Sequence, residues 1–346
     1  MAYIDYSHGG NIYEIEQRCK RSIIDFSANI NPLGLPPAVE KSIFKNLDKI
    51  LHYPDLNATS ITRKIAKHWG ISSNNILLGN GSAELIYLIV TATRPKTTLI
   101  PVPTFSEYER AARNVKSRIE FLRLKEGDGF KLDLSCLNRT DLTFICNPNN
   151  PTGNLVLGDR LKVRRPLVID EAFMDFLPNQ RDYTLIREAA RSKKIFVLRT
   201  FTKFFALPGL RLGYLITHKD NVERLRRFML PWNTNSLAQI ASESILKDRP
   251  YIKKTYQLIE RERGFLFEQL NKTGGLKPYP AVANFILIKI ERNGITSRSL
   301  KDALIKRGVL IRDCSNFRNL NNKYIRVAVR LRNENLKLLE ALKTSL

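Results

Sequence analysis

One lysine lies in a setting that suits covalent chemistry. Lys203 follows an apolar segment and is flanked by hydroxyl and aromatic side chains, and Arg211 follows eight residues later. Most lysines lie at the surface with a solvated amine, which is the simplest interpretation. The functional alternative is a lysine that forms a Schiff base, with the hydroxyls of Thr200 and Thr202 and the guanidinium of Arg211 holding the phosphate of a cofactor.

Other polar residues follow apolar segments in the same way. Asp170 ends the apolar segment 167–169, where a carboxylate can bind a ligand, although such residues often cap a helix. The segment 147–153, Asn-Pro-Asn-Asn-Pro-Thr-Gly, predicts a rigid loop or a plain turn. The loop 79–84, Gly-Asn-Gly-Ser-Ala-Glu, lacks the third glycine of a dinucleotide-binding fingerprint. A glycine turn that opens a helix can still hold a phosphate.

Short apolar segments alternate with helical patterns through the middle of the chain. Residues 83–92 and 184–192 are typical of helices. The predicted strands are 97–101, 119–124, 142–146, 167–169, 195–198 and 212–216. Strands that alternate with helices indicate crossover connections and a mostly parallel sheet covered on both faces. The sequence therefore predicts an α/β fold.

The C-terminal third has a different pattern. It predicts a long helix over about 236–269, a strand at 285–290, a helix at 299–307, strands at 309–312 and 324–328, and a last helix at 334–342. A Pro-rich segment at 31–37 separates an N-terminal arm from the first predicted helix. We therefore expect an arm, 1–40, that contributes to the smaller domain and the substrate site. A large α/β domain, 41–245, and a small α+β domain, 246–346, complete the prediction.

Composition excludes some classes of protein and leaves others open. The 346 residues are 43% hydrophobic and 26% charged, as in globular proteins. The net charge of +24 is spread along the chain and suits either a nucleic-acid binder or an enzyme with phosphorylated ligands. No apolar run approaches the ~20 residues that cross a bilayer, and the first ten residues do not resemble a signal peptide. The four cysteines and four histidines lack metal-ligand spacing, so we expect no metal and a reducing cytoplasm.

The motifs are far more specific together than alone. In chain order, the glycine loop, Pro-Thr-Phe at 103–105, Asn-Pro-Thr-Gly at 150–153, Asp-Glu-Ala-Phe at 170–173 and Thr-Lys at 202–203 resemble the fold type I pyridoxal-phosphate enzymes. Within them, the chain is similar to the histidinol-phosphate aminotransferase branch. Its segments 8–11, 25–34 and 310–317 are similar to the threonine-phosphate decarboxylases of the cobalamin pathway. The resemblance covers nearly the whole chain and implies a large domain with a mostly parallel sheet plus a smaller α+β domain.

The resemblance also implies a role for each matching residue. Lys203 and Asp170 are the implied catalytic residues, one forming the Schiff base with pyridoxal 5′-phosphate and the other pairing with its ring nitrogen. The residues implied to bind the cofactor are Gly81, Ser82, Ala83, Phe105, Asn150, Asp170, Thr200, Thr202, Lys203, Arg211 and Tyr53. Because Tyr53 would reach the cofactor of a neighbouring subunit, a homodimer with shared sites is implied. The residues implied to bind the substrate are His8, Asn29, Asn150, Arg312 and Arg326, of which Arg326 matches a carboxylate-binding arginine.

One residue departs from the pattern of the branch. Its aminotransferases usually carry tyrosine where this chain has Phe173, so one hydrogen bond to the cofactor's O3′ is lost. This favours decarboxylation of L-threonine O-3-phosphate to (R)-1-amino-2-propanol O-2-phosphate and carbon dioxide in cobalamin biosynthesis. L-serine O-phosphate decarboxylation to ethanolamine phosphate and histidinol-phosphate amino transfer stay as alternatives. A nucleic-acid-binding protein without catalysis is disfavoured by the intact Lys203 and Asp170, so we expect no nucleic-acid or membrane partner.

Overall fold

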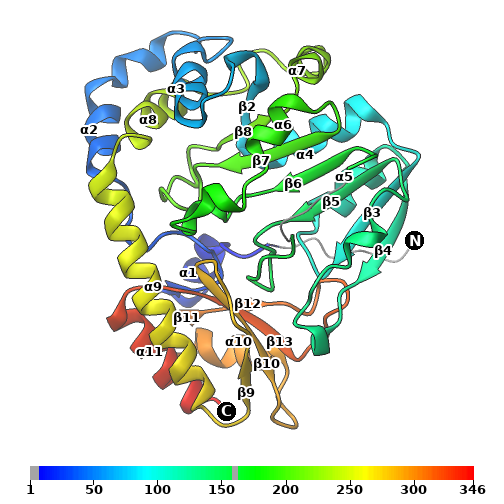
Figure 1. Ribbon diagram of the computed structural model, residues 1–346. Helices are drawn as coiled ribbons and strands as arrows, with labels where there is room; N and C mark the ends of the chain where they lie inside the picture. Colours follow the sequence, from blue (N-terminus) through cyan, green and yellow to red (C-terminus); the bar gives the residue numbers. More distant parts are fainter. Residues whose placement is uncertain (1–7, 158–162) are drawn as a thin grey trace.

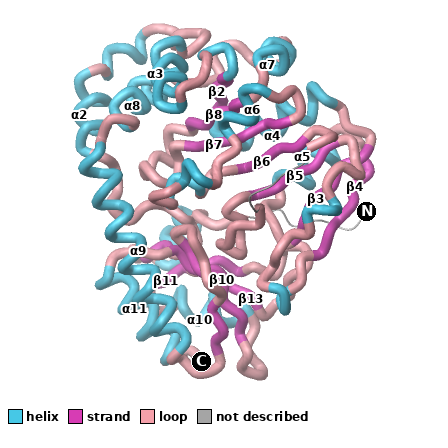
Figure 2. Tube along the Cα trace, viewed as in Figure 1, coloured by secondary structure: helices cyan, strands magenta, loops and turns pink. Residues whose placement is uncertain are grey.

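A mixed sheet lies at the centre of the molecule (Figures 1 and 2). The computed structural model describes residues 8–157 and 163–346. Within them, seven strands form this sheet in the order β2-β8-β7-β6-β5-β3-β4. They are β2 (Ile76–Asn80), β3 (Thr97–Val102), β4 (Arg118–Arg123), β5 (Leu142–Cys146), β6 (Leu167–Asp170), β7 (Ile195–Thr200) and β8 (Leu212–Ile216). Neighbours from β7 to β4 are parallel, whereas β8 is antiparallel to β2 and β7.

Helices cover both faces of this sheet. They are α2 (Pro37–Lys45), α3 (Thr59–Trp69), α4 (Gly81–Thr93), α5 (Glu107–Asn114), α6 (Ile186–Arg191), α7 (Lys219–Arg226) and α8 (Ser236–Ile245). Apolar side chains of α4, α5 and α7 pack with Val168 and Phe196 in one core. Those of α3, α6 and α8 pack with Ile169 and Val197 in another. Because successive strand residues point to opposite faces, the central strands are apolar and buried along their length.

A second sheet lies below the first, beside the C-terminal helices (Figure 1). Its order is β12-β13-β10-β9 among the described residues. The C-terminal elements are α9 (Arg249–Asn271), β9 (Leu276–Pro278), β10 (Phe285–Ile290), α10 (Ser297–Ile305), β11 (Val309–Leu310), β12 (Arg312–Asp313), β13 (Tyr324–Ala328) and α11 (Arg332–Lys343). The arm joins this unit, because β1 (Ile24–Asp25) pairs with β11 and Phe26 is buried in the same core.

Three predicted elements are corrected by the structure. The predicted helix 236–269 is divided into α8 and α9, because the Asp248 side chain accepts the Tyr251 N–H at 3.0 Å and starts a new helix. The predicted strand 309–312 is divided between β11 and β12, which belong to different sheets. The arm carries a helix of its own, α1 (Ile12–Cys19), ahead of the Pro-rich segment. The domain boundaries at residues 40 and 245 stay a prediction.

Short 3-10 helices connect many of these elements. They are η1 (Leu47–Leu51), η2 (Ser73–Asn75), η3 (Glu126–Asp128), η4 (Leu134–Cys136), η5 (Met174–Phe176) and η6 (Gln180–Asp182).

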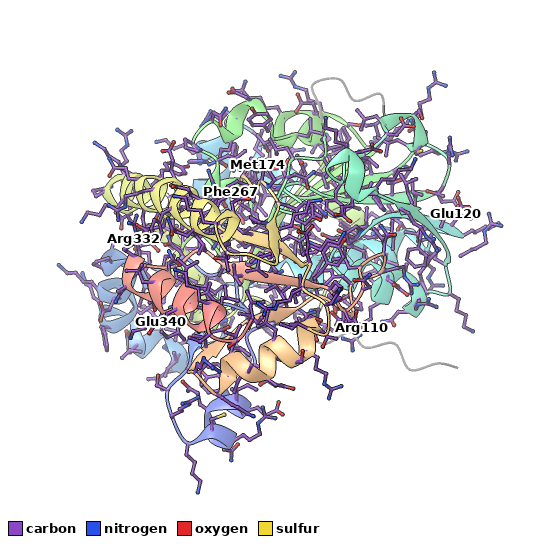
Figure 3. All side chains as sticks on the ribbon, turned by 90° about the horizontal axis from the view of Figure 1, so that it is seen from below. Arg110, Glu120, Met174, Phe267, Arg332 and Glu340 are labelled. Carbon is purple, nitrogen blue, oxygen red and sulfur yellow. The ribbon has the colours of Figure 1, made fainter. Side chains whose placement is uncertain are left out.

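Many charged side chains extend outward around the molecule in Figure 3, where Glu120 lies at the outer edge and the buried Met174 lies inside. Among the described helices, none is both long and apolar enough to span a bilayer.

Candidate active site

A pocket of about 300 Å³ lies where β5, β6 and β7 end. Its wall combines the arm, the loops that follow the central strands, and residues of β12 and β13. The predicted site residues that line it are His8, Asn29, Ser82, Ala83, Phe105, Asn150, Asp170, Thr200, Thr202, Lys203, Arg211, Arg312 and Arg326. Parallel strands deliver their carboxyl ends to one edge of a sheet, which explains why residues so distant in sequence meet there.

Lys203 lies in the loop between β7 and β8, half-buried in the pocket wall. Its backbone oxygen accepts the N–H of Asn31 at 3.0 Å, which ties this loop to the arm. Burial, together with the nearby Arg326 and Arg211, lowers the pKa of Lys203 from 10.5 to about 8. A larger fraction of the Lys203 amine is therefore unprotonated close to neutral pH, and the unprotonated amine is the form that attacks a carbonyl.

Asp170 is the last residue of β6 and is only 3% exposed. The Tyr108 hydroxyl donates to its Oδ2 at 2.7 Å, and the Ala172 N–H donates to its Oδ1 at 3.0 Å. Burial raises the pKa of Asp170, while these two hydrogen bonds and Lys203 oppose the rise. A buried carboxylate is stabilised further by a cationic partner, and the protonated ring nitrogen of the predicted cofactor is such a group.

Tyr108 is a pocket residue that the sequence motifs did not reveal. It is fully buried, stacks on Phe144 at a centroid distance of 4.9 Å, and lines the pocket. The only signal in the sequence is its place three residues after Phe105, which does not reveal a hydrogen bond to a carboxylate 62 positions away. Ser27 is a second such residue, since its backbone oxygen accepts from Arg326 Nη2 at 2.7 Å.

Backbone amides at the start of α4 and the hydroxyls at and just after the end of β7 line one side of the pocket and form a cradle. Gly81 has a φ of +79°, and a Cβ there would lie 2.5 Å from Nη2 of Arg211. The hydroxyls of Thr200 and Thr202 face each other at 2.6 Å. The first amides of a helix have no intrahelical partner and attract anions. The cradle therefore fits the phosphate of the predicted cofactor, with Gly81 allowing the guanidinium to approach.

Two arginines from neighbouring strands enter the pocket together. Arg312 of β12 and Arg326 of β13 are partners in the antiparallel register. Arg326 donates to Oδ1 of Asn150 and to the backbone oxygen of Ser27, and both arginines are at most 9% exposed. Burial lowers the pKa of Arg326 to about 10, and Arg312 adds to the effect. Two buried guanidinium groups side by side favour a ligand that carries more than one negative charge.

The arm contributes two further predicted residues. His8 lines the pocket, but its Nε2 lies 2.8 Å from Oε1 of Glu107, and its ring lies 5.3 Å from that of Phe105. Asn29 is 3% exposed, and its Oδ1 has no hydrogen-bond partner among the described residues. An unpartnered buried acceptor is costly, so a ligand that donates to Asn29 would stabilise the site.

Two residues singled out in the sequence place no hydroxyl in the pocket. Tyr53 is 80% exposed and stacks on Trp232 at a centroid distance of 4.5 Å, outside the pocket wall. Phe173 lines the pocket without a hydroxyl and packs edge-on against Phe285 at 4.9 Å. Tyr53 therefore lies at the surface, away from the other predicted site residues.

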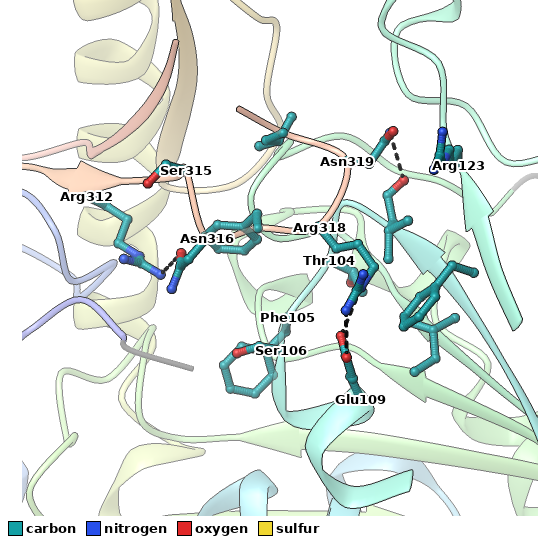
Figure 4. Close-up of a pocket in the computed structure, with 15 residues that line it drawn as sticks. Thr104, Phe105, Ser106, Glu109, Arg123, Arg312, Ser315, Asn316, Arg318 and Asn319 are labelled. Carbon is teal, nitrogen blue, oxygen red and sulfur yellow. Dashed lines mark hydrogen bonds and ion pairs between the residues drawn. The ribbon is translucent and has the colours of Figure 1, made fainter. Parts of the chain in front are cut away.

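A second cavity of about 540 Å³ adjoins the pocket and shares Phe105, Ser106, Arg312 and Phe317 with it. Figure 4 shows Arg312 hydrogen-bonded to Asn316, and Arg318 paired with Glu109 across the cavity. The loop after β12 thus forms a wall between the two spaces. The loop is held against the large sheet, because Asn319 Nδ2 donates to the backbone oxygens of Val102 at 3.3 Å and Leu124 at 2.9 Å.

Comparisons with known proteins agree with this geometry. The family model "Aminotransferase class I and II" matches residues 21–342. The threonine-phosphate decarboxylase of Salmonella typhimurium is 37% identical over 100% of this chain and 98% of its own. Two solved structures each cover 92% of this chain, with 98% of their own chains matched. They are the histidinol-phosphate aminotransferase of Clostridium acetobutylicum (32% identity, TM-score 0.84) and the L-threonine-O-3-phosphate decarboxylase of Porphyromonas gingivalis (28%, 0.80).

These matches confirm the predicted fold, because they span nearly the whole chain and both sheets. The family match begins after α1 and ends within α11, so it includes the described pocket residues except His8 and Gly9. The chain belongs to the class I and II aminotransferase family.

Proposed function

We propose that this protein is a pyridoxal-phosphate-dependent decarboxylase that converts L-threonine O-3-phosphate to (R)-1-amino-2-propanol O-2-phosphate and carbon dioxide in cobalamin biosynthesis. The observation that carries the proposal is the pocket itself, where Lys203 and Asp170 lie with the arginine pair Arg312 and Arg326. The full-length similarity to the Salmonella typhimurium threonine-phosphate decarboxylase supports the same reaction.

The cradle and the buried carboxylate support pyridoxal 5′-phosphate as the cofactor, in agreement with the family assignment. When bound, this cofactor supplies an electron sink for a bond broken at the substrate's Cα. Lys203 would hold it covalently, Asp170 would keep its ring nitrogen protonated, and Asn150 would donate to O3′. Phe105 would contact the ring. The phosphate would be held by Gly81, Ser82, Ala83, Thr200, Thr202, Arg211 and Tyr53 of the partner subunit.

The arginine pair explains how the protein selects the bond that breaks. Arg326 would bind the substrate carboxylate as a rigid fork, while Arg312, His8 and Asn29 would bind its phosphate. Anchoring both ends would fix the rotation about the bond between the substrate's nitrogen and Cα. Binding energy at the phosphate would then be used to orient the carboxylate. Lys203, whose pKa is lowered to about 8, or a water molecule then returns a proton to Cα.

Two other reactions compete with this proposal. Serine phosphate differs from threonine phosphate by one methyl group, which a pocket discriminates by only ~1–3 kcal/mol. Amino transfer from histidinol phosphate is disfavoured by Phe173, which lacks the hydroxyl found in that branch, and by the arm residue His8 in the pocket. Incubating the cofactor-loaded enzyme with each compound, while measuring carbon dioxide and carbonyl product separately, distinguishes all three. Carbonyl product without carbon dioxide would refute the decarboxylase proposal.

The exposed apolar surface near Tyr53 supports a homodimer. Large apolar side chains gather in the segment around η1 and in the stretch after α7, and Leu51 and Leu230 are 79% and 74% exposed. Contiguous exposed apolar surface of this kind is typical of protein interfaces. Tyr53 lies within it, so a two-fold partner seated there would receive the Tyr53 hydroxyl. Sedimentation of the cofactor-loaded protein at micromolar concentration tests the dimer.

Two further assignments complete the proposal. The arm (1–40), the large domain (41–245) and the small domain (246–346) are proposed as the functional units, since the arm pairs with β11 and also lines the pocket. The reducing cytoplasm is the proposed location, because all four cysteines are free and three of them are buried.

A further inference from the structure

Two buried glutamates lie at the start of α5, immediately after Phe105. Glu107 and Glu109 are 6% and 7% exposed. Carboxylates are seldom buried to this extent unless they are paired. Each pairs with a segment that is far away in the sequence and that carries a substrate-facing residue.

Glu107 holds the arm. Its Oε1 lies 2.8 Å from Nε2 of His8, and its Oε2 accepts the Tyr87 hydroxyl at 2.7 Å. The next residues of the arm are fixed against Ser27, since the Gly10 N–H donates to its Oγ at 2.8 Å and a Cβ at Gly9 would overlap its backbone oxygen. The His8 ring is therefore fixed at the edge of the pocket, from both sides.

Glu109 holds the loop that follows β12. Arg318 donates to both of its carboxylate oxygens, through Nε at 3.1 Å and Nη2 at 2.8 Å (Figure 4). On the same loop, Asn316 Oδ1 accepts from Arg312 Nη2 at 2.7 Å, and the Phe317 ring lies 5.2 Å from the Arg312 guanidinium. A bidentate pair of this kind is geometrically specific, so it fixes the loop that positions Arg312.

We propose that Glu107 and Glu109 are positioning residues, and that α5 is the common anchor for the two side chains that receive the substrate's phosphate. The proposal rests on the proposed function, in which His8 and Arg312 bind that phosphate. Since α5 directly follows Phe105, one rigid element sets both phosphate-binding groups relative to the residue that contacts the cofactor ring. Neither glutamate touches the substrate, and each acts through its partner.

Double-mutant cycles on the cofactor-loaded enzyme test this assignment, with each glutamate serving as the matched control for the other. Glu107→Gln is combined with His8→Ala, and Glu109→Gln with Arg318→Ala. Each single change should raise KM for threonine phosphate about 10- to 100-fold, with a smaller change in kcat. Within each pair, the second change should raise KM by less than about a further 2-fold. In the cross-combination of Glu107→Gln with Arg318→Ala, the two increases in KM should multiply.

Other outcomes overturn the assignment. If KM is unchanged in the glutamate variants, the glutamates only stabilise α5. The same conclusion follows if the increases in KM multiply within a pair as fully as they do between pairs. If Glu107→Gln does not fold, His8→Gln tests the same contact from its exposed side. Inorganic phosphate titrated calorimetrically into each loaded variant measures the anchoring without turnover. An enzyme that releases no carbon dioxide refutes the proposed function, while weaker phosphate binding in both glutamate variants still supports the anchor.

Discussion

Replacing Tyr108 with phenylalanine should move the pH dependence of catalysis in a direction that the structure fixes. The hydroxyl donates to Asp170 at 2.7 Å in a fully buried setting. A hydrogen bond to a charged group contributes ~1.5–3 kcal/mol, and one pKa unit corresponds to ~1.4 kcal/mol. Removing the hydroxyl should therefore raise the pKa of Asp170 further, because the bond favours the ionised carboxylate.

The sign of the effect on activity follows from the protonation state that is needed. Under the proposed function, Asp170 has to be ionised to keep the cofactor's ring nitrogen protonated, so we expect activity to be lost as pH falls through the pKa of Asp170. A higher pKa shifts this acidic limb of kcat/KM toward neutral pH, and the variant should lose most activity at the acidic end. The assay is carbon dioxide release from threonine phosphate across the pH range in which the loaded enzyme stays folded.

A matched control separates this effect from the loss of any buried hydroxyl. Tyr214 is 2% exposed, and its hydroxyl accepts from Trp69 Nε1 at 3.3 Å away from the pocket wall. Tyr214→Phe should change stability without moving the acidic limb. An acidic limb that stays in place in Tyr108→Phe, or that moves to lower pH, would refute the role assigned to the hydroxyl.

Four other changes test separate parts of the site and the fold. Borohydride reduction of the loaded protein should attach the pyridoxyl group to Lys203, as peptide mass spectrometry can show; attachment at another lysine contradicts the assignment. Mixing Tyr53→Phe and Lys203→Ala subunits should give hybrid dimers in which one site carries both changes and the other carries neither, so activity recovers on mixing; no recovery argues against shared sites. Arg312→Ala should raise KM about 10-fold or more and increase the fraction of single turnovers that end in the pyridoxamine form; an unchanged fraction means that phosphate anchoring does not select the bond. Burial raises the pKa of Glu126, but hydrogen bonds from Tyr279, Tyr324 and two lysines outweigh burial and hold this pKa at about 2, below its usual 4.5. Glu126→Gln should therefore lower the free energy of unfolding at pH 7 by up to about 3 kcal/mol. This stabilisation is fully present above the pKa of the unfolded state and disappears as pH falls toward about 2. The difference in the free energy of unfolding between variant and parent, measured by urea unfolding, should therefore shrink over that range. A difference that does not change with pH contradicts the role assigned to Glu126.

The elements that were predicted well are those whose pattern is local. The strand 285–290 was predicted with the bounds that the structure has, because its mostly apolar residues are framed by Asn284 and Glu291. β2 was missed because Ile76, Leu77 and Leu78 are too few to indicate a strand before a glycine turn. β1 is two residues long and forms where it pairs with β11 across the molecule, which no local pattern reveals.

The same distinction holds within the site. Lys203, Asp170 and Asn150 could be singled out because each stands in a short motif at or just after a strand end, and the structure places all three in one pocket. Tyr108 and Glu107 were missed because their importance comes from partners 62 and 99 positions away. Tertiary contacts of this kind depend on how the arm and the C-terminal sheet dock on the large sheet, and a motif carries no information about that docking.

The charges of the pocket explain why these remote segments are needed. Among the described residues that line it, Lys203, Arg211, Arg312 and Arg326 are basic, and Asp170 is the one carboxylate. Such an excess is unfavourable in a buried site unless anions complete it. Under the proposed function the cofactor phosphate, the substrate phosphate and the substrate carboxylate do so. Under the same proposal, decarboxylation removes the group that Arg326 binds, so the product leaves that guanidinium without an anionic partner and should bind more weakly than the substrate. The arginine proposed to orient the carboxylate would thereby also favour release of the product.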